Sequence, residues 1–185
     1  MIELRHGSVA LRPIKESDIA DYIRWTTDKT GWDDWEIAWN GNDPDDAGYI
    51  DAQIRQLERE GDNPPDFYTA LEIDTADGRH IGSIGVYYDK DNDKYEIGIS
   101  IPEMDIWGKG HGADAMMCYI KYLFDNTNAD AVITRTNSGN IPMMRLAAKL
   151  GFVEDERHIG HITRDGKAYD AVGYSLSRAA FNANF

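Results

Sequence analysis

A short glycine-rich segment, Trp107-Gly-Lys-Gly-His-Gly-Ala113, contains the residues whose types and spacing best suit a chemical role. Closely spaced glycines let the main chain approach a ligand, and an apolar stretch with helical spacing follows them directly. The first turn of a helix has backbone N–H groups without intrahelical partners, and the helix dipole adds positive potential there. Lys109 supplies a further positive charge. The segment therefore predicts a binding site for a phosphate or pyrophosphate.

Two kinds of nucleotide-binding loop could explain this segment. Gly108, Gly110 and Ala113 fit the GxGxxG/A spacing of dinucleotide-binding proteins, which would make the chain an NAD(P)-dependent oxidoreductase. That fingerprint requires a tight turn directly after the strand, whereas residues 102–106 intervene here. It also requires an acidic residue about 20 positions later, where this chain has Arg135-Thr-Asn137. A Walker P-loop is excluded because no Gly-Lys-Ser/Thr occurs, so the dinucleotide interpretation stays as the alternative.

The elements that must position this loop alternate between strand-like and helix-like stretches. Two-residue alternation between turn-forming residues predicts strands, and apolar residues three or four apart predict helices. The predicted strands are 8–14, 67–74, 79–88, 94–101, 131–136, 152–163 and 168–177; the predicted helices begin at Ser17 and Pro44 and cover 113–124 and 141–150. This order predicts an α+β fold of the three-layer α/β kind, with a mixed sheet of about seven strands and helices on both faces.

Length and charge limit what the chain can bind. The 185 residues suggest one domain, residues 1–185, with a core at about residues 9–177. The 33 Asp and Glu residues against 19 Lys and Arg give a formal net charge of −14. Such a chain disfavours sequence-independent binding to nucleic acid or anionic lipid, which both need a cationic surface. The excess acid either favours a cationic partner or only provides solubility.

Apolar runs and cysteines indicate the compartment. No apolar run approaches the ~18 residues needed to span a bilayer, and the first residues lack a hydrophobic signal core. The single cysteine, Cys118, excludes an internal disulfide and a zinc site with several thiolates. We therefore expect a cytoplasmic protein without a membrane segment, and we predict no metal site.

The loop and a second motif together resemble the GNAT superfamily of N-acetyltransferases. Residues 107–112 lie on the family's Gln/Arg-x-x-Gly-x-Gly/Ala pattern, with Trp at its first position. Asn140-Ile-Pro-Met-Met-Arg-Leu-Ala-Ala-Lys-Leu-Gly-Phe152 lies on the family's NxxSxxxYxxxGF segment. The Trp-Gly-Lys-Gly run and the closing strands around Asp165-Gly-Lys-Ala-Tyr-Asp170 resemble the RimJ/RimL-like branch, which acetylates ribosomal-protein N-termini and includes relatives acting on small amines. The resemblance covers about Val9 to Ser177 and implies the GNAT acyl-CoA N-acyltransferase fold.

The resemblance implies acetyl-CoA as co-substrate, bound without a metal. Its pyrophosphate would lie on the loop and the start of the next helix, and its pantetheine arm would pair with the preceding strand as an added strand does. The corresponding loop positions are Trp107, Gly108, Lys109, Gly110, His111, Gly112 and Ala113, and the strand positions are Ile99, Ser100 and Ile101. Asn140, at the start of a later helix, would contact pantetheine or water, or would act only as a helix N-cap.

The resemblance also implies a general base on the strand that leads to the loop. Acetyl transfer needs a neutral amine, and a well-placed base that accepts the amine's proton contributes about 10²–10⁴ in rate. Glu96 occupies the matching position, on the strand face shared with Gly98 and Ser100; the alternative is a solvated glutamate. The family's usual acid positions are Ala147 and Met143 here, and neither side chain can protonate a leaving thiolate. A non-catalytic acyl-CoA-binding module is therefore a further alternative.

In this fold the connection between the first two helices borders the acceptor cleft. Between Asp28 and Asp51 the sequence has eight acidic residues and one basic residue, interleaved with tryptophans. Carboxylates beside indole faces suit a cation through Coulomb attraction and cation–π contact. The candidate acceptor-binding residues are Trp32, Asp33, Asp34 and Trp35. The expected acceptor is a cationic small-molecule amine, aminoglycoside-like or polyamine-like, or a protein N-terminus, and a homodimer is a family-level expectation.

Overall fold

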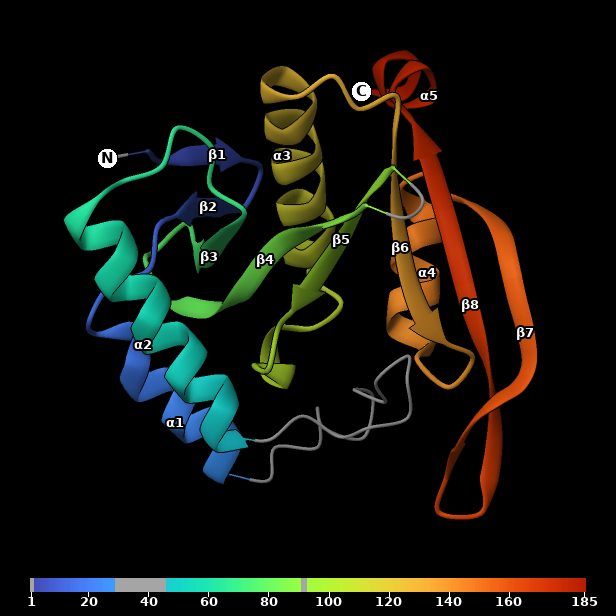
Figure 1. The fold of residues 1–185 in the computed structure, drawn as a ribbon, viewed down its shortest axis with the longest axis horizontal. Coiled ribbons are helices and arrows are strands. Elements are labelled where there is room, and N and C mark those ends of the chain that lie inside the picture. The colour runs from blue at the N-terminus through green and yellow to red at the C-terminus, as the bar shows by residue number, and fades with distance from the viewer. Residues whose placement is uncertain (1, 29–45, 91–92) are drawn as a thin grey trace. The chain divides into compact units, whose positions relative to one another are not determined.

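A computed structural model describes residues 2–28, 46–90 and 93–185 of the chain (Figure 1). These residues divide into two compact units. The first contains the described residues within 2–28, 46–85 and 99–118, and the second contains those within 86–98 and 119–185. Two strands and one helix contribute residues to both units.

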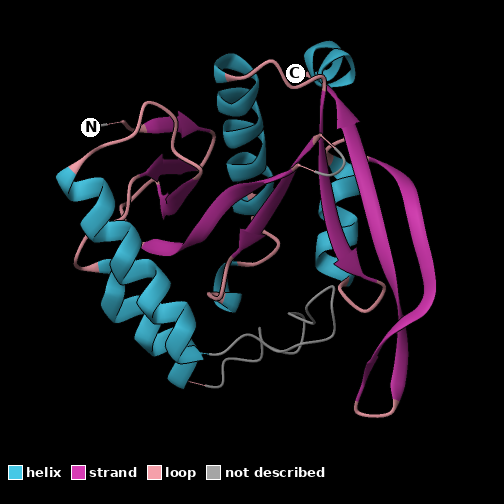
Figure 2. Cartoon of the chain, viewed as in Figure 1, coloured by secondary structure: helices cyan, strands magenta, loops and turns pink. Residues whose placement is uncertain are grey.

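The described residues form eight strands and five α-helices, shown by type in Figure 2. Their bounds are β1 Leu4–His6, β2 Val9–Arg12, α1 Asp18–Thr27, α2 Asp46–Asp62, β3 Ala70–Thr75, β4 His80–Asp89, β5 Lys94–Ser100, the 3-10 turn η1 Met104–Ile106, α3 His111–Asn126, β6 Ala131–Asn137, α4 Ile141–Lys149, β7 Val153–Arg164, β8 Lys167–Ser177 and α5 Arg178–Asn184. The strand order is β1-β2-β3-β4-β5-β6-β8-β7, and β5 pairs with β6 in parallel while the other strand pairs with known register are antiparallel. The predicted mixed α+β fold is confirmed.

One strand, β1, one α-helix, α5, and the 3-10 turn η1 were not predicted from the sequence. The first predicted strand, 8–14, is shorter in the structure, because a turn at Gly7 with a φ of 52° joins β1 to β2 as a hairpin. The short helix α5 begins at Ser177, whose side chain accepts a hydrogen bond from the N–H of Ala180. The predicted start of the second helix, Pro44, lies outside the described residues.

The first unit has a core in which α1 and α2 pack together. Ile14, Tyr22 and Trp25 form a buried cluster, and Tyr49 and Leu57 of α2 pack against it. The tyrosine and tryptophan rings meet edge to face at a centroid distance of 5.3 Å. This contact agrees with the geometry that aromatic pairs prefer, and it explains why the apolar face of α1 points inward.

The strand β2 is buried at every position, including the charged Arg12. Its guanidinium lies 2.6 Å from a carboxylate oxygen of Asp18 and 2.6 Å from one of Asp74. Burial opposes the charged form, but the two hydrogen-bonded carboxylates outweigh it and raise the pKa of Arg12. The ion pairs therefore join β2, β3 and the first turn of α1.

In the second unit, β6 and β7 pair with opposite edges of β8. Its fully buried side chains include Tyr119, Leu123, Val132 and Leu176. Arg178 closes the end of α3 by donating hydrogen bonds to the backbone oxygens of Phe124 at 2.7 Å and Ala129 at 2.9 Å. A cation among the last carbonyls of a helix also favours the helix dipole. None of the helices in the described part of the chain is long and apolar enough to cross a bilayer.

Candidate functional site

The glycine-rich loop in the first unit has the backbone conformation expected for an anion-binding turn. Gly108 and Gly110 have φ angles of 79° and 99°, a region that side-chain-bearing residues avoid. No atom lies within 4 Å of the position that a Cβ would occupy at either glycine, so the space above the main chain is open. The helix α3 then begins at His111, two residues earlier than predicted. The amides of its first turn therefore adjoin this loop.

The side chain of Trp107 fixes the loop to the end of the preceding strand. Its indole Nε1–H donates a 2.8 Å hydrogen bond to the backbone oxygen of Ile101. This hydrogen bond ties the first residue of the loop to the residue that follows β5. The carbonyl oxygen of Ile101 therefore already accepts a hydrogen bond from within the protein. The two other predicted strand positions, Ile99 and Ser100, are half-buried.

The backbone of Ser100 comes very close to strand β4. A Cβ added at Gly82 would lie 2.0 Å from the backbone oxygen of Ser100, a distance that no real Cβ contact shows. Only glycine fits at this position. Gly82 therefore allows the end of β5, which is predicted to bind pantetheine, to lie close to β4.

A hydrogen-bonded chain connects the start of α3 to the β1–β2 hairpin. The Ser8 hydroxyl lies 2.7 Å from Nδ1 of His111 and donates a 2.7 Å hydrogen bond to Asp114 Oδ2. The backbone N–H of Ser8 donates to the same oxygen at 2.8 Å. Sequence analysis missed Ser8 and Asp114, because nothing local distinguishes them and 106 positions separate them.

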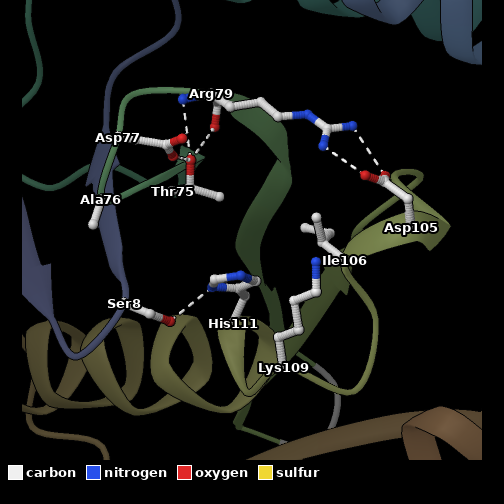
Figure 3. A pocket seen from close by; sticks show the side chains of 9 residues that line it. All are labelled: Ser8, Thr75, Ala76, Asp77, Arg79, Asp105, Ile106, Lys109 and His111. Carbon is white, nitrogen blue, oxygen red and sulfur yellow. Dashed lines mark hydrogen bonds and ion pairs between the residues drawn. The ribbon is translucent and has the colours of Figure 1, made fainter.

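A cavity of about 390 Å³ lies beside the loop within the first unit (Figure 3). Its lining residues are Ser8, Thr75, Ala76, Asp77, Arg79, Asp105, Ile106, Lys109 and His111. Figure 3 shows Lys109 and His111 reaching into it from the loop and the start of α3. Of the predicted cofactor-binding residues, the structure brings Lys109 and His111 to this cavity. A third basic residue of the lining, Arg79, forms an ion pair with Asp105, with Nη1 2.8 Å from Oδ2.

A buried polar cluster under α1 was also missed by sequence analysis. Glu72 accepts a 2.8 Å hydrogen bond from the hydroxyl of Tyr22 and lies 2.9 Å from Nε2 of His80. Nδ1 of His80 lies 3.0 Å from Asp21, and Trp25 donates to Glu103 at 2.8 Å. The detectable signal was a charged residue, Glu72, inside an apolar strand. The cluster joins α1 to β3 and β4.

The predicted general base, Glu96, lies in the second unit and is not simply solvated. Its carboxylate is 28% exposed, and Oε2 accepts a 2.7 Å ion-pair hydrogen bond from Arg135 Nη1. Arg135 also lies 3.2 Å from Glu156 and 3.7 Å from Asp89. The sequence contained one signal for Arg135, a charged side chain in the β-branched strand β6.

Two further positions of the second unit that the sequence analysis singled out are Asn140 and Ala147. The Asn140 side chain accepts a 3.0 Å hydrogen bond from the N–H of Met143, so Asn140 is an N-cap of α4. Ala147 is fully buried, and its methyl side chain has no group that could act as an acid.

The predicted acceptor-binding residues Trp32, Asp33, Asp34 and Trp35 lie outside the described residues. In the described part of the chain, no group of three or more His, Cys, Asp or Glu side chains is arranged to hold a metal ion.

Comparisons with known proteins agree with this architecture. A sequence profile described as an acetyltransferase (GNAT) domain matches residues 8–153. No curated protein matches the chain.

Three solved structures illustrate the similarity in fold. The chain resembles Mycobacterium smegmatis RimJ in complex with CoA-disulfide, with 19% identity, a TM-score of 0.70 and coverage of 96% of this chain and 87% of that one. It also resembles RimL, a ribosomal L7/L12 alpha-N-protein acetyltransferase in complex with coenzyme A, with 12% identity, a TM-score of 0.74 and coverage of 97% and 99%. For the ribosomal-protein-S5-alanine acetyltransferase from Vibrio fischeri the identity is 16%, the TM-score 0.71 and the coverage 98% and 99%.

Proposed function

The chain belongs to the GNAT acetyltransferase family, and we propose that it moves the acetyl group of acetyl-CoA to a primary amine of a cationic small molecule or a protein N-terminus. The observation that carries this proposal is the loop before α3, where Gly108 and Gly110 expose main chain to open space. Family membership leaves the dinucleotide interpretation of the loop without support.

The residues of the loop suit the anionic half of acetyl-CoA. The backbone amides from Gly108 to Ala113 would hold the pyrophosphate, because a helix N-terminus combines unpaired N–H donors with a positive dipole end. Lys109 adds a side-chain donor next to the same turn, and His111 lines the same cavity. Local donors of this kind allow an anionic co-substrate to bind although the whole chain has a net charge of −14.

Glu96 is the proposed general base. Its Oε2 is held by Arg135, whereas Oε1 has no hydrogen-bond partner among the described residues, so Oε1 can accept the proton of the acceptor ammonium. The neutral amine nitrogen then attacks the acetyl carbonyl, and coenzyme A leaves as the thiolate. The new amide nitrogen then loses its extra proton, and because Ala147 and Met143 cannot donate one, this proton reaches the thiolate through water.

A cationic acceptor is the proposed substrate class. Among the described residues of the second unit, the carboxylates of Asp89, Glu96 and Glu156 lie around the guanidinium of Arg135, so these groups together leave an excess of negative charge near the proposed general base. Negative potential attracts an ammonium group. The relatives RimL and the Vibrio fischeri enzyme are described as acting on ribosomal proteins, which makes a peptide N-terminus the natural second probe.

The test is thiol release from acetyl-CoA with a panel of amines: spermidine, kanamycin, a basic peptide with N-terminal alanine, and an acidic peptide of the same length. We expect release with at least one cationic amine. Glu96→Gln should lower kcat by about 10²–10⁴ with an unchanged Kd for acetyl-CoA, and part of the rate should return at higher pH because more amine is neutral. Glu58→Gln, on the exposed side of α2, is the matched control.

Two outcomes would contradict the proposal. A preference for the acidic peptide would overturn the cationic acceptor. The non-catalytic alternative is favoured by the missing acid at Ala147 and Met143, and it predicts tight acetyl-CoA binding by calorimetry with no thiol release from any amine.

A further inference from the structure

Four residues form a row across one side of the sheet in the second unit. Glu96 on β5 pairs in register with Ile133 on β6, two residues before Arg135. Arg135 pairs with Gly173 on β8, and Gly173 pairs in turn with Glu156 on β7. Arg135 therefore lies between two carboxylates that come from strands on either side of it.

The glycine in this row makes the longer contact possible. Arg135 and Glu156 are on strands separated by β8, yet Arg135 Nε and Glu156 Oε2 lie 3.2 Å apart. A Cβ at Gly173 would lie 2.9 Å from the Cβ of Glu156 and 3.0 Å from its Oε2. The missing side chain at Gly173 thus leaves the space through which the two side chains meet.

The ion pairs hold the guanidinium of Arg135 in one place. Its side chain is 17% exposed, and burial opposes its charge, but the charges and hydrogen bonds of Glu96 and Glu156 outweigh burial and raise the pKa of Arg135. Arg135 is thus a permanent cation with Nη1 on Glu96 and Nε on Glu156. Two further ionisable groups of the described residues lie nearby: His158 is 2.9 Å from the other oxygen of Glu156, and Asp89 is 3.7 Å from Arg135.

We propose that Arg135 is a positioning residue for the general base, which fixes Glu96 Oε2 so that Oε1 faces the acceptor amine. A guanidinium N–H bonded to one carboxylate oxygen restricts rotation of the carboxyl group and keeps it anionic. The proton passes from the acceptor ammonium to Oε1, and Arg135 itself neither gives nor takes a proton. This inference rests on the proposed function, since it assigns a role to the residue beside the proposed base.

The test compares Arg135→Met and Arg135→Lys in the intact chain, with acetyl-CoA and the amine that gives thiol release. Loss of a charge-assisted hydrogen bond predicts a kcat about ten- to a hundredfold lower in Arg135→Met, with the Kd for acetyl-CoA unchanged. Arg135→Lys retains the charge and should recover part of the rate. Lys121→Met, which removes an exposed cation paired with Asp125, is the matched control and should retain the wild-type kcat.

A double-mutant cycle separates positioning from a general structural effect. If Arg135 acts through Glu96, then Glu96→Gln/Arg135→Met has the same kcat as Glu96→Gln alone, because the group that Arg135 positions is already gone. A merely structural role predicts that the two losses multiply. Multiplying losses, or a wild-type kcat in Arg135→Met, would overturn the inference.

The same experiment distinguishes this inference from the proposed function. If wild type releases thiol and Glu96→Gln does not, the proposed base stands, and the Arg135 variants alone decide the positioning role. If wild type releases no thiol with any amine, or if Glu96→Gln is fully active, the proposed base itself is overturned and the role of Arg135 is overturned with it.

Discussion

The hydroxyl of Ser8 donates a hydrogen bond to Asp114 at 2.7 Å, and this bond determines the tautomer of His111. A serine hydroxyl has one proton, and here that proton lies toward the carboxylate. The short 2.7 Å contact between Ser8 Oγ and His111 Nδ1 must therefore contain the proton of Nδ1. In this tautomer Nε2 is the acceptor on the ring, and it is the ring nitrogen left to contact a ligand.

We predict that Ser8→Ala weakens binding of coenzyme A about three- to tenfold, because His111 loses the partner that orients its ring. The backbone N–H of Ser8 still donates to Asp114 in this variant, so the hairpin remains attached and the free energy of unfolding should fall by only about 1 kcal/mol. Isothermal titration with coenzyme A and chemical denaturation measure the two effects. Wild-type affinity together with lower stability would mean that the chain of hydrogen bonds is only structural.

We predict that Gly82→Ala destabilises the protein by about 1–3 kcal/mol or more, because the new Cβ would collide with the backbone oxygen of Ser100. The backbone oxygen of Ser100 cannot rotate away from the new Cβ as the end of a flexible side chain could. Gly61→Ala is the control: Gly61 is in α2 with no atom near its Cβ position, and alanine there should stabilise the helix by about 0.5–1 kcal/mol. Urea denaturation of both variants tests the pair, and equal stabilities would contradict the close approach.

We predict that His80 makes the protein more stable at mildly acidic pH than at alkaline pH. Burial opposes protonation of His80, but Glu72, Asp18 and Asp21 outweigh it and raise its pKa above the ordinary value of 6.5. The folded state therefore favours the protonated ring, so this stabilisation is complete below about pH 6.5 and is lost as the pH rises through the higher folded pKa.

Chemical denaturation at about pH 6 and about pH 9 checks this prediction. His80→Gln should lower the free energy of unfolding more at the acidic pH than at the alkaline pH. His6→Gln, which changes an exposed histidine, should have little effect at either pH. An equal loss at both values in His80→Gln would show that the charge of His80 contributes nothing to stability.

We predict that Cys118 reacts very slowly with thiol reagents in the native protein. The side chain belongs to a residue only 8% exposed, and burial raises the pKa of its thiol to about 11, so little thiolate is present near neutral pH. Ellman's reagent should detect about one thiol per chain after denaturation and almost none before it. Prompt reaction of the native protein with the reagent would contradict this prediction. If Cys118 reacts slowly, the thiol-release assay detects the thiol of coenzyme A and not that of the protein.

Much of the fold was predictable because its signals are local. Strand alternation, helical spacing and turn residues located all the described strands and α-helices except β1 and α5, which are short and lack such patterns. The glycine loop was predictable too, because Gly108 and Gly110 stand between a strand-like and a helix-like stretch. The acid positions occupied by Ala147 and Met143 were also readable, because a side chain without a donor cannot protonate anything, whatever its surroundings.

The sequence by itself therefore determined the order of the strands and α-helices from β2 to β8, the glycine loop at the start of α3 and the family to which these patterns are similar. Only the tertiary structure decided the partners of Glu96, because Arg135 is 39 positions away and Glu156 reaches Arg135 across β8 at Gly173. It likewise decided the contact of Ser8 with Asp114. An ion pair or hydrogen bond depends on which strands are neighbours and in what register, and residue spacing along the chain contains no direct measure of either.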